Sequence, residues 1–90
     1  MLVENQSSKG IALAVQEVLP QAKVYILDPQ NDGVHLEAIV IAKEFETLSL
    51  LQQHQMVMKA LKAHFSEDLH ALGLKTLTPQ SWEKQKHHYL

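Results

Sequence analysis

The sequence predicts a small α/β (α+β) domain with the element order α-β-β-α-β-α. Three observations carry this prediction: two apolar stripes at helical spacing, two β-rich segments around a dense cluster of turn residues, and a Thr-Pro pair that opens a last helix. The chain has 90 residues, 46% of them hydrophobic, which is normal for one small folded domain. We therefore expect a single domain over residues 1–90, with its core at about residues 8–86.

An apolar stripe at helical spacing predicts the first helix. The stripe consists of Ile11, Val15, Val18 and Leu19. Pro20 ends the helix, because proline cannot continue it. Ser7 and Ser8 are candidate caps at its start, and an earlier start that includes Leu2 and Val3 is the alternative.

Two strands are expected next, as a hairpin. Residues 23–27 are rich in β-branched and aromatic side chains, and residues 35–42 form a second such run. The intervening segment Asp-Pro-Gln-Asn-Asp-Gly is dense in turn residues and short enough to make the two strands antiparallel neighbours. Alternation along the second strand places Leu36, Ala38 and Val40 on one face.

The second half of the chain predicts the longest helix, a third strand and a final helix. The stripe of the long helix consists of Leu50, His54, Val57, Leu61 and Phe65. Residues 71–77 are expected to form the third strand. Thr78 then serves as a helix N-cap with Pro79 at the first helical position. This last helix runs through Trp82 to about Lys86.

The topology brings two histidines to one edge of the sheet. A helix between two paired strands returns the chain to the same end, so the second and third strands are expected to be parallel. Their N-terminal ends then lie about 5 Å apart, with His35 opening one strand and His70 directly preceding the other. Alternation puts His35 opposite Leu36 but His70 on the face of Leu72, which leaves the relative facing of the imidazoles open. The long helix is expected on the face that carries Leu36.

Composition excludes several classes of function. The net charge is −2 with neutral histidines, so no global basic field attracts nucleic acid or acidic lipid. The chain has no cysteine, which removes disulfides, thiol nucleophiles and thiolate metal sites. Metal chemistry would have to use its histidines or carboxylates. Neighbouring carboxylates are not opposed across a cleft, and no glycine-rich phosphate loop occurs, so we expect no enzymatic activity.

Two features of the chain bear on its location. Residues 1–9 lack the basic and apolar regions of a signal peptide. The longest nearly apolar run, residues 36–42, is too short to span a bilayer. We expect a cytoplasmic protein. His87 and His88, near the C-terminus, are interpreted as a solvated tail or a tag remnant.

From residue 45 onward the chain resembles the BolA family. The family pattern has an aromatic residue after the second strand, then a helix with a histidine, a valine and a leucine at fixed spacing. The matching residues are Phe45, His54, Val57 and Leu61. Residues 70–82 read HALGLKTLTPQSW and match the family pattern H-A-L-x-L-K-T-x-T-P-x-x-W. With the upstream DGVHLEAIVIAKEF, the resemblance covers about residues 11–82.

Three residues depart from the family pattern. Thr47 stands where the family usually has glycine, so the turn after the aromatic residue must be made differently. Gln53 and Gln55 stand where the family usually places arginines around the helix histidine. Their neutral side chains remove positive charge from the proposed nucleic-acid face.

The resemblance implies a KH-like fold with a three-stranded mixed sheet, helices mainly on one face, and no enzymatic activity. Family members are implicated in iron–sulfur cluster trafficking with monothiol glutaredoxins and in transcriptional regulation. In the cluster-bridged complex, a [2Fe–2S] cluster lies between the two proteins, and the glutaredoxin contributes its cysteine and glutathione. Carried onto this chain, the ligands on the BolA side are His70 and His35, with Asp32 or water as the competitor of His35. Imidazole is an established iron ligand, as in Rieske centres.

Two functions from different classes remain open. The first is an adaptor, monomeric alone and heterodimeric with a glutaredoxin, that shares a cluster. The second is a nucleic-acid-binding transcriptional regulator, for which Lys75, Thr76 and Thr78 are the candidate contacts, with capping and core packing as the alternative role. The chain lacks the GxxG loop of KH domains and its lysines are scattered, so any binding to DNA is expected to be weak. His54 is expected to be a buried structural residue and His64 to complement the helix dipole.

Overall fold

The observed order of helices and strands is the predicted one, with short 3₁₀ turns added. The computed structural model describes residues 6–32, 35–64 and 72–89. Its elements are α1 (Gln6–Val18), β1 (Lys23–Leu27), β2 (Glu37–Ile41), η1 (Lys43–Thr47), α2 (Leu50–Lys62), β3 (Gly73–Leu77), α3 (Pro79–Gln85) and η2 (Lys86–His88). Among these helices, none has the length and apolar character needed to cross a bilayer.

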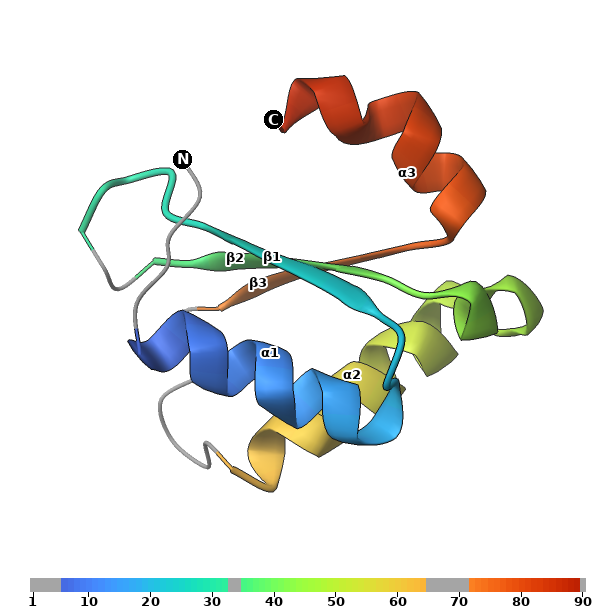
Figure 1. The fold of residues 1–90 in the computed structure, drawn as a ribbon, viewed down its shortest axis with the longest axis horizontal. Coiled ribbons are helices and arrows are strands. Elements are labelled where there is room, and N and C mark those ends of the chain that lie inside the picture. The colour runs from blue at the N-terminus through green and yellow to red at the C-terminus, as the bar shows by residue number, and fades with distance from the viewer. Residues whose placement is uncertain (1–5, 33–34, 65–71, 90) are drawn as a thin grey trace.

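The described strands form one mixed sheet (Figure 1), and their order in it is β1-β2-β3. β1 and β2 are antiparallel, with Lys23 opposite Ile41. β2 and β3 are parallel, with Glu37 opposite Gly73. The predicted parallel pairing is therefore confirmed, because the crossover through α2 returns the chain to the starting end of the sheet. The N-terminal ends of β2 and β3 lie side by side.

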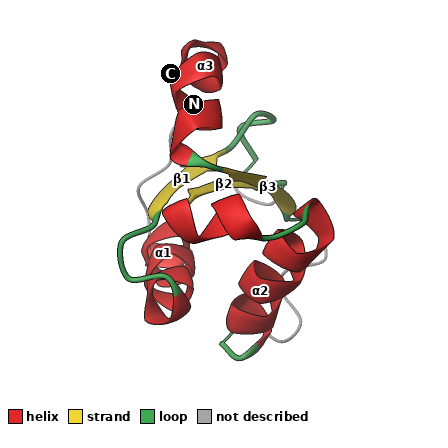
Figure 2. Ribbon diagram, turned by 90° about the vertical axis from the view of Figure 1, so that its right-hand side faces the viewer, coloured by secondary structure: helices red, strands yellow, loops and turns green. Residues whose placement is uncertain are grey.

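Helices α1 and α2 cover one face of the sheet, as Figure 2 shows. Leu36, Ala38 and Val40 belong to the apolar cluster on this face, as the alternation predicted. Val57 and Leu61 of α2 are fully buried in the same cluster. Val57 and Leu61 of the predicted stripe thus belong to the core, whereas Leu50 at its start is 63% exposed.

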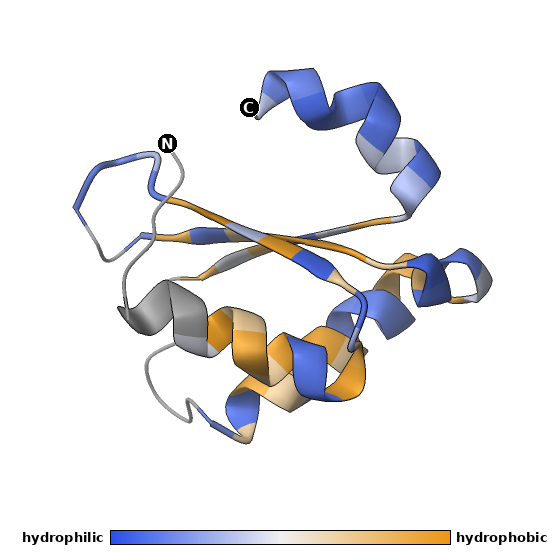
Figure 3. Cartoon of the chain, in the orientation of Figure 1, coloured by the Kyte–Doolittle hydropathy of each residue, from blue (hydrophilic) through white to orange (hydrophobic). Residues whose placement is uncertain are grey.

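Helix α3 lies on the opposite face of the sheet, which refines the expectation of helices mainly on one face (Figures 1 and 2). Most of α3 is hydrophilic (Figure 3), and its buried residue is Trp82. The Trp82 ring stacks on Tyr25 with 5.1 Å between centroids and on Tyr89 with 6.1 Å. The other buried members of this second cluster are Leu27, Ile39, Ile41 and Leu77.

Local sequence explains where α2 and α3 begin. The Ser49 hydroxyl accepts a hydrogen bond from the backbone N–H of Gln52, and the Gln52 side chain accepts one from the backbone N–H of Ser49. This reciprocal pair is a capping box. Thr78 caps α3 by accepting from the backbone N–H of Ser81 at 3.2 Å, and Pro79 follows at the first position. The predicted start of the last helix is confirmed.

Several other element ends differ from the prediction. α1 is described from Gln6, so Ser7 and Ser8 lie within the helix and not at its cap position. α2 ends at Lys62, and Phe65, the last member of the predicted stripe, lies outside the described residues. β2 begins two residues later than expected, because the backbone N–H of His35 bonds to a loop side chain and not to a strand.

A pair of leucines on α2 tests the packing of this helix. Leu61 is fully buried, whereas the Leu51 side chain is 66% exposed. We expect Leu61→Ala to lower the free energy of unfolding by about 2–5 kcal/mol, since it leaves a cavity in the core. Leu51→Ala should change it by no more than about 0.5 kcal/mol. Urea denaturation followed by circular dichroism measures both, and equal midpoints for the two variants would contradict the packing described.

Candidate functional site

The loop between β1 and β2 is held by a chain of side-chain hydrogen bonds that ends on His35. Asp28 is buried, and its Oδ1 accepts from the backbone N–H of Asp32 at 3.1 Å. Asn31 has a φ of 54°, a left-handed conformation that asparagine tolerates. Asp32 Oδ1 accepts from the backbone N–H of His35 at 2.9 Å, and its Oδ2 lies 2.6 Å from His35 Nδ1. Side chains of the loop itself therefore position the imidazole.

The His35 imidazole is exposed where the chain enters β2. Its side chain is 55% accessible to solvent, so a second molecule can reach it. Asp32 bonds the ring at Nδ1, which leaves Nε2 as the nitrogen for a ligand from outside the loop. Asp32, the competing ligand at this loop, has both carboxylate oxygens bonded to His35.

The start of β3 lies against the strand that His35 precedes. The backbone N–H of Gly73 donates to the carbonyl of Leu36 at 2.8 Å, and Gly73 is opposite Glu37 in the parallel ladder. His70, the other predicted ligand, lies outside the described residues. The first residue of β3, Gly73, is therefore bonded to Leu36, the residue that directly follows His35.

The His35–Asp32 pair has the donor chemistry that is common for a metal-ligating histidine. Neutral imidazole is the commonest metal ligand in proteins, and its second ring nitrogen usually donates to a carboxylate or a carbonyl. His35 and Asp32 have this arrangement. Within residues 6–32, 35–64 and 72–89, no three His, Asp or Glu side chains gather as a complete metal site would require.

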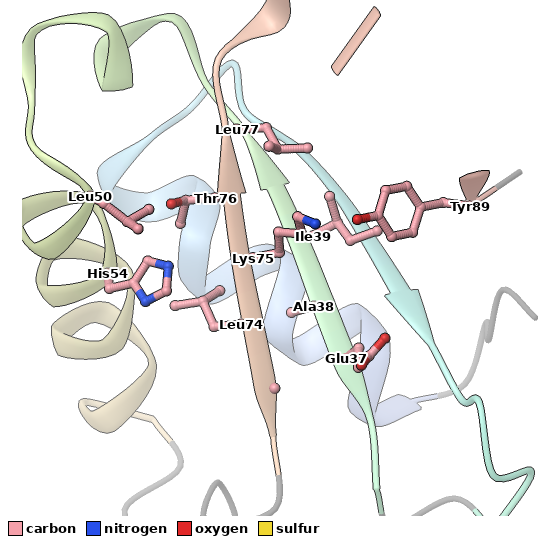
Figure 4. A pocket seen from close by; sticks show the side chains of 11 residues that line it. Glu37, Ala38, Ile39, Leu50, His54, Leu74, Lys75, Thr76, Leu77 and Tyr89 are labelled. Carbon is pink, nitrogen blue, oxygen red and sulfur yellow. The ribbon is translucent and has the colours of Figure 1, made fainter. Parts of the chain in front are cut away.

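A groove of about 560 Å³ follows β3 and opens beside α2 (Figure 4). His54 lies along it, half-buried, and does not have the fully buried position predicted for it. Figure 4 shows His54 projecting from α2 toward β3. The other lining residues are Glu37, Ala38, Ile39, Leu50, Gly73, Leu74, Lys75, Thr76, Leu77 and Tyr89.

The three candidate contacts near the end of β3 differ in exposure. Lys75 is exposed, and its Nζ lies 5.2 Å from the centroid of the Tyr89 ring, within cation–π range. Thr76 is buried, and its hydroxyl donates to Gln53 Oε1 at 2.7 Å. Thr78 is half-buried and caps α3. Lys75 is therefore the member of this group with an outward side chain, while both hydroxyls make internal bonds.

The BolA-like protein family model matches residues 3–81 of the chain. This chain belongs to the BolA family. The matched range takes in the loop that carries Asp32 and His35, the parallel pair β2–β3, and the start of α3.

Individual BolA proteins agree with this membership. A BolA-like protein of Dictyostelium discoideum is 33% identical over 57 residues, which are 62% of this chain and 50% of that protein. A Haemophilus influenzae protein named DNA-binding transcriptional regulator BolA is 28% identical over 51 residues, 57% of this chain and 50% of that protein. The solved structure of a BolA homologue from Coxiella burnetii is 33% identical, with a TM-score of 0.66, and covers 92% of this chain and 99% of that one. The chain spans half the length or less of the first curated relatives that it matches.

Gln53, one of the departures from the BolA pattern, has a structural role that the sequence did not indicate. Its Nε2 donates to the carbonyls of Phe45 at 3.1 Å and Leu48 at 3.0 Å, and its Oε1 accepts from Thr76. One amide thus ties η1 and the start of α2 to β3. A clue that could have pointed to this role is the replacement of the usual arginine by a neutral side chain that both donates and accepts.

Thr47, another departure from the BolA pattern, lies at the end of η1. The turn after the aromatic residue is made by this 3₁₀ helix, and Phe45 is its buried residue. The Thr47 hydroxyl donates to the carbonyl of Glu44 at 3.4 Å. Asn31 is the only non-glycine residue with a positive φ in the described part of the chain. Thr47 therefore does not have a left-handed backbone. The 3₁₀ turn of this chain therefore needs no glycine at position 47.

His64 has a specific partner across the helix pair. Its Nε2 lies 2.7 Å from Glu17 Oε2 of α1, and both side chains are exposed. The sequence indicated only a favourable position near the end of α2. The contact joins the chain just after α2 to α1.

The two glutamines that replace family arginines provide a matched test. Gln53→Ala removes the partner of two backbone carbonyls and of the buried Thr76 hydroxyl, so we expect it to cost about 1–3 kcal/mol of stability. Gln55 is exposed on the same helix, and Gln55→Ala should cost no more than about 0.5 kcal/mol. Thermal denaturation measures both changes. A Gln53→Ala variant as stable as Gln55→Ala would refute the bridging role.

Proposed function

We propose that this protein is a non-enzymatic adaptor that binds a monothiol glutaredoxin and shares a [2Fe–2S] cluster with it, in iron–sulfur trafficking or in iron and redox regulation. The observation that carries the proposal is the exposed His35 imidazole, whose Nδ1 is bonded by a carboxylate beside the N-terminal ends of β2 and β3. The BolA resemblance assigns ligand roles to His35 and to His70, which precedes the first residue of β3 by three positions.

Ligand chemistry supports a shared site. The chain has no cysteine, so it can offer a cluster only imidazole or carboxylate ligands. The glutaredoxin cysteine and glutathione would supply thiolates from the other side. Mixed imidazole and thiolate ligation of a two-iron cluster has a precedent in Rieske centres. The role of this chain is then to present imidazoles at a fixed edge of the sheet, with Asp32 orienting one of them.

Replacement of His70 tests the ligand assignment most directly. The mixture of this protein, a monothiol glutaredoxin, glutathione and iron with sulfide should give a visible chromophore. We expect His70→Ala to abolish or strongly change the visible absorption and circular dichroism of that mixture, because a cluster ligand is lost. The proteins without cluster should still associate in size-exclusion chromatography. A wild-type spectrum from His70→Ala would remove this residue from the site.

Replacement of His35 should have a milder effect. We expect His35→Ala to shift the spectrum and to make the cluster more labile, since a carboxylate or water can take its place. Its unfolding free energy should stay within about 1 kcal/mol of the wild type, because the imidazole is exposed. His54→Ala is the matched control: His54 lies along the β3 groove, and its loss should leave the chromophore unchanged. A chromophore that depends on His54 and not on His35 would move the site to that groove.

Nucleic-acid binding is the second candidate function. It is supported by the Haemophilus influenzae relative named a DNA-binding transcriptional regulator and by the exposed Lys75 in the middle of the edge strand β3. The net charge of −2 and the neutral Gln53 and Gln55 oppose a strong phosphate contribution. As a regulator, the protein would bind DNA through the junction of β3 and α3.

Gel-shift titration distinguishes the two functions. We expect no tight complex with duplex DNA at about 150 mM salt, because few lysines are available to release counterions. Lys75→Ala should weaken any residual binding equally for unrelated sequences, whereas Lys59→Ala on α2 serves as a charge-matched control. Nanomolar, sequence-dependent binding at that salt concentration would favour the regulator over the adaptor.

A further inference from the structure

We propose that Asp32 is a positioning residue that holds the His35 imidazole in the Nδ1–H tautomer and so makes Nε2 the atom that meets a metal. The metal itself rests on the proposed function, whereas the tautomer is a property of this chain alone. Nε2 of His35 is then the ligand atom, and Asp32 is the residue that selects it. Both follow from hydrogen bonds within the loop between β1 and β2.

The geometry around Asp32 leaves one arrangement of the shared proton. The backbone N–H of His35 is a donor, and it bonds to Oδ1 at 2.9 Å. This bond orients the carboxylate so that Oδ2 lies 2.6 Å from His35 Nδ1. An ionised carboxylate can only accept, so the hydrogen in this second bond belongs to Nδ1. In the neutral imidazole, Nε2 is then the unprotonated nitrogen with a lone pair for a metal.

Asp28 keeps Asp32 in place. The Asp28 side chain is buried, and its Oδ1 accepts from the backbone N–H of Asp32. The carboxylate that orients His35 is thus attached to a loop that the end of β1 anchors. A ligand nitrogen held in advance loses little freedom on binding, and a carboxylate on the other nitrogen fixes the orientation of the ring.

His64 is an internal reference, because its carboxylate partner contacts the other ring nitrogen. Its contact with Glu17 uses Nε2, at 2.7 Å from Oε2. The same reasoning assigns His64 the Nε2–H tautomer. His35 and His64 are thus both exposed and paired with carboxylates, but through different ring nitrogens. The tautomer of each histidine should change only when its own carboxylate partner is replaced.

Nitrogen NMR of the metal-free full chain tests the tautomer. In protein labelled with ¹⁵N-histidine, at a pH where imidazoles are neutral, we expect Nδ1–H for His35 and Nε2–H for His64. Asp32→Asn should convert His35 to Nε2–H, since the amide oxygen can keep the backbone contact while its NH₂ group faces Nδ1 and donates to it. Glu17→Gln is the matched control and should leave the His35 signals unchanged. A wild-type His35 in the Nε2–H form, or one that Asp32→Asn leaves unaltered, overturns the inference.

Cluster lability in the glutaredoxin complex then tests whether the tautomer matters. We expect Asp32→Asn to lose the cluster about tenfold faster than the wild type, since removing such a partner of a ligand lowers metal affinity by at least about tenfold. The double variant with His35→Ala should lose it no faster than His35→Ala alone, because both changes act through one imidazole. If Asp32→Asn converts the tautomer but keeps the cluster while His35→Ala loses it, the positioning role is wrong. If His35→Ala also keeps the cluster, the ligand assignment of the proposed function fails, and the metal-free tautomer still decides the role of Asp32.

Discussion

The parallel pairing of β2 with β3 is the constraint on which the other features of this BolA protein depend. These strands are joined through α2, so their pairing requires the helix to cross one face of the sheet, where Val57 and Leu61 are fully buried. Because Glu37 is opposite Gly73 in this pairing, the N-terminal ends of both strands lie side by side at the same end of the sheet. A slip of one residue would move Ile39 and Ile41 of β2 from the cluster under α3 to the cluster under α1 and α2, and the packing of both clusters would be lost.

A polar side chain, and not only the apolar core, connects α2 to the sheet. Gln53 connects η1 and the start of α2 to the hydroxyl of Thr76 in β3, a position where the BolA pattern has an arginine. An amide can donate and accept at once, whereas a guanidinium only donates, so the neutral residue suits an internal bridge. The same replacement reduces the positive charge of the surface. One residue change therefore bears both on the stability of the helix–sheet contact and on the choice between the two candidate functions.

The loop before β2 is held in its conformation by hydrogen bonds from its own side chains, whereas the strands beside it are held by the backbone ladder of the sheet. Asp28 bonds the backbone of Asp32, and Asp32 bonds both the backbone and the ring of His35. A single imidazole oriented in this way is what the proposed adaptor, which has no cysteine, would offer to a shared metal site. In the proposed complex the partner would supply the thiolates, and the ligand set would be complete only in the heterodimer.

The sequence alone determined the order of the elements, the inward face of β2 and the Thr78–Pro79 start of α3, because periodicity and capping depend on residues within a few positions of each other. The tertiary structure decided the rest. It placed α3 on the face opposite α1 and α2, left His54 half-buried beside a groove, and joined His64 to Glu17, 47 positions away. Such contacts depend on how separate elements pack, and spacing along the chain does not encode them. Even the bond between Asp32 and His35, three residues apart, needed the structure, since the loop conformation selects which ring nitrogen the carboxylate meets.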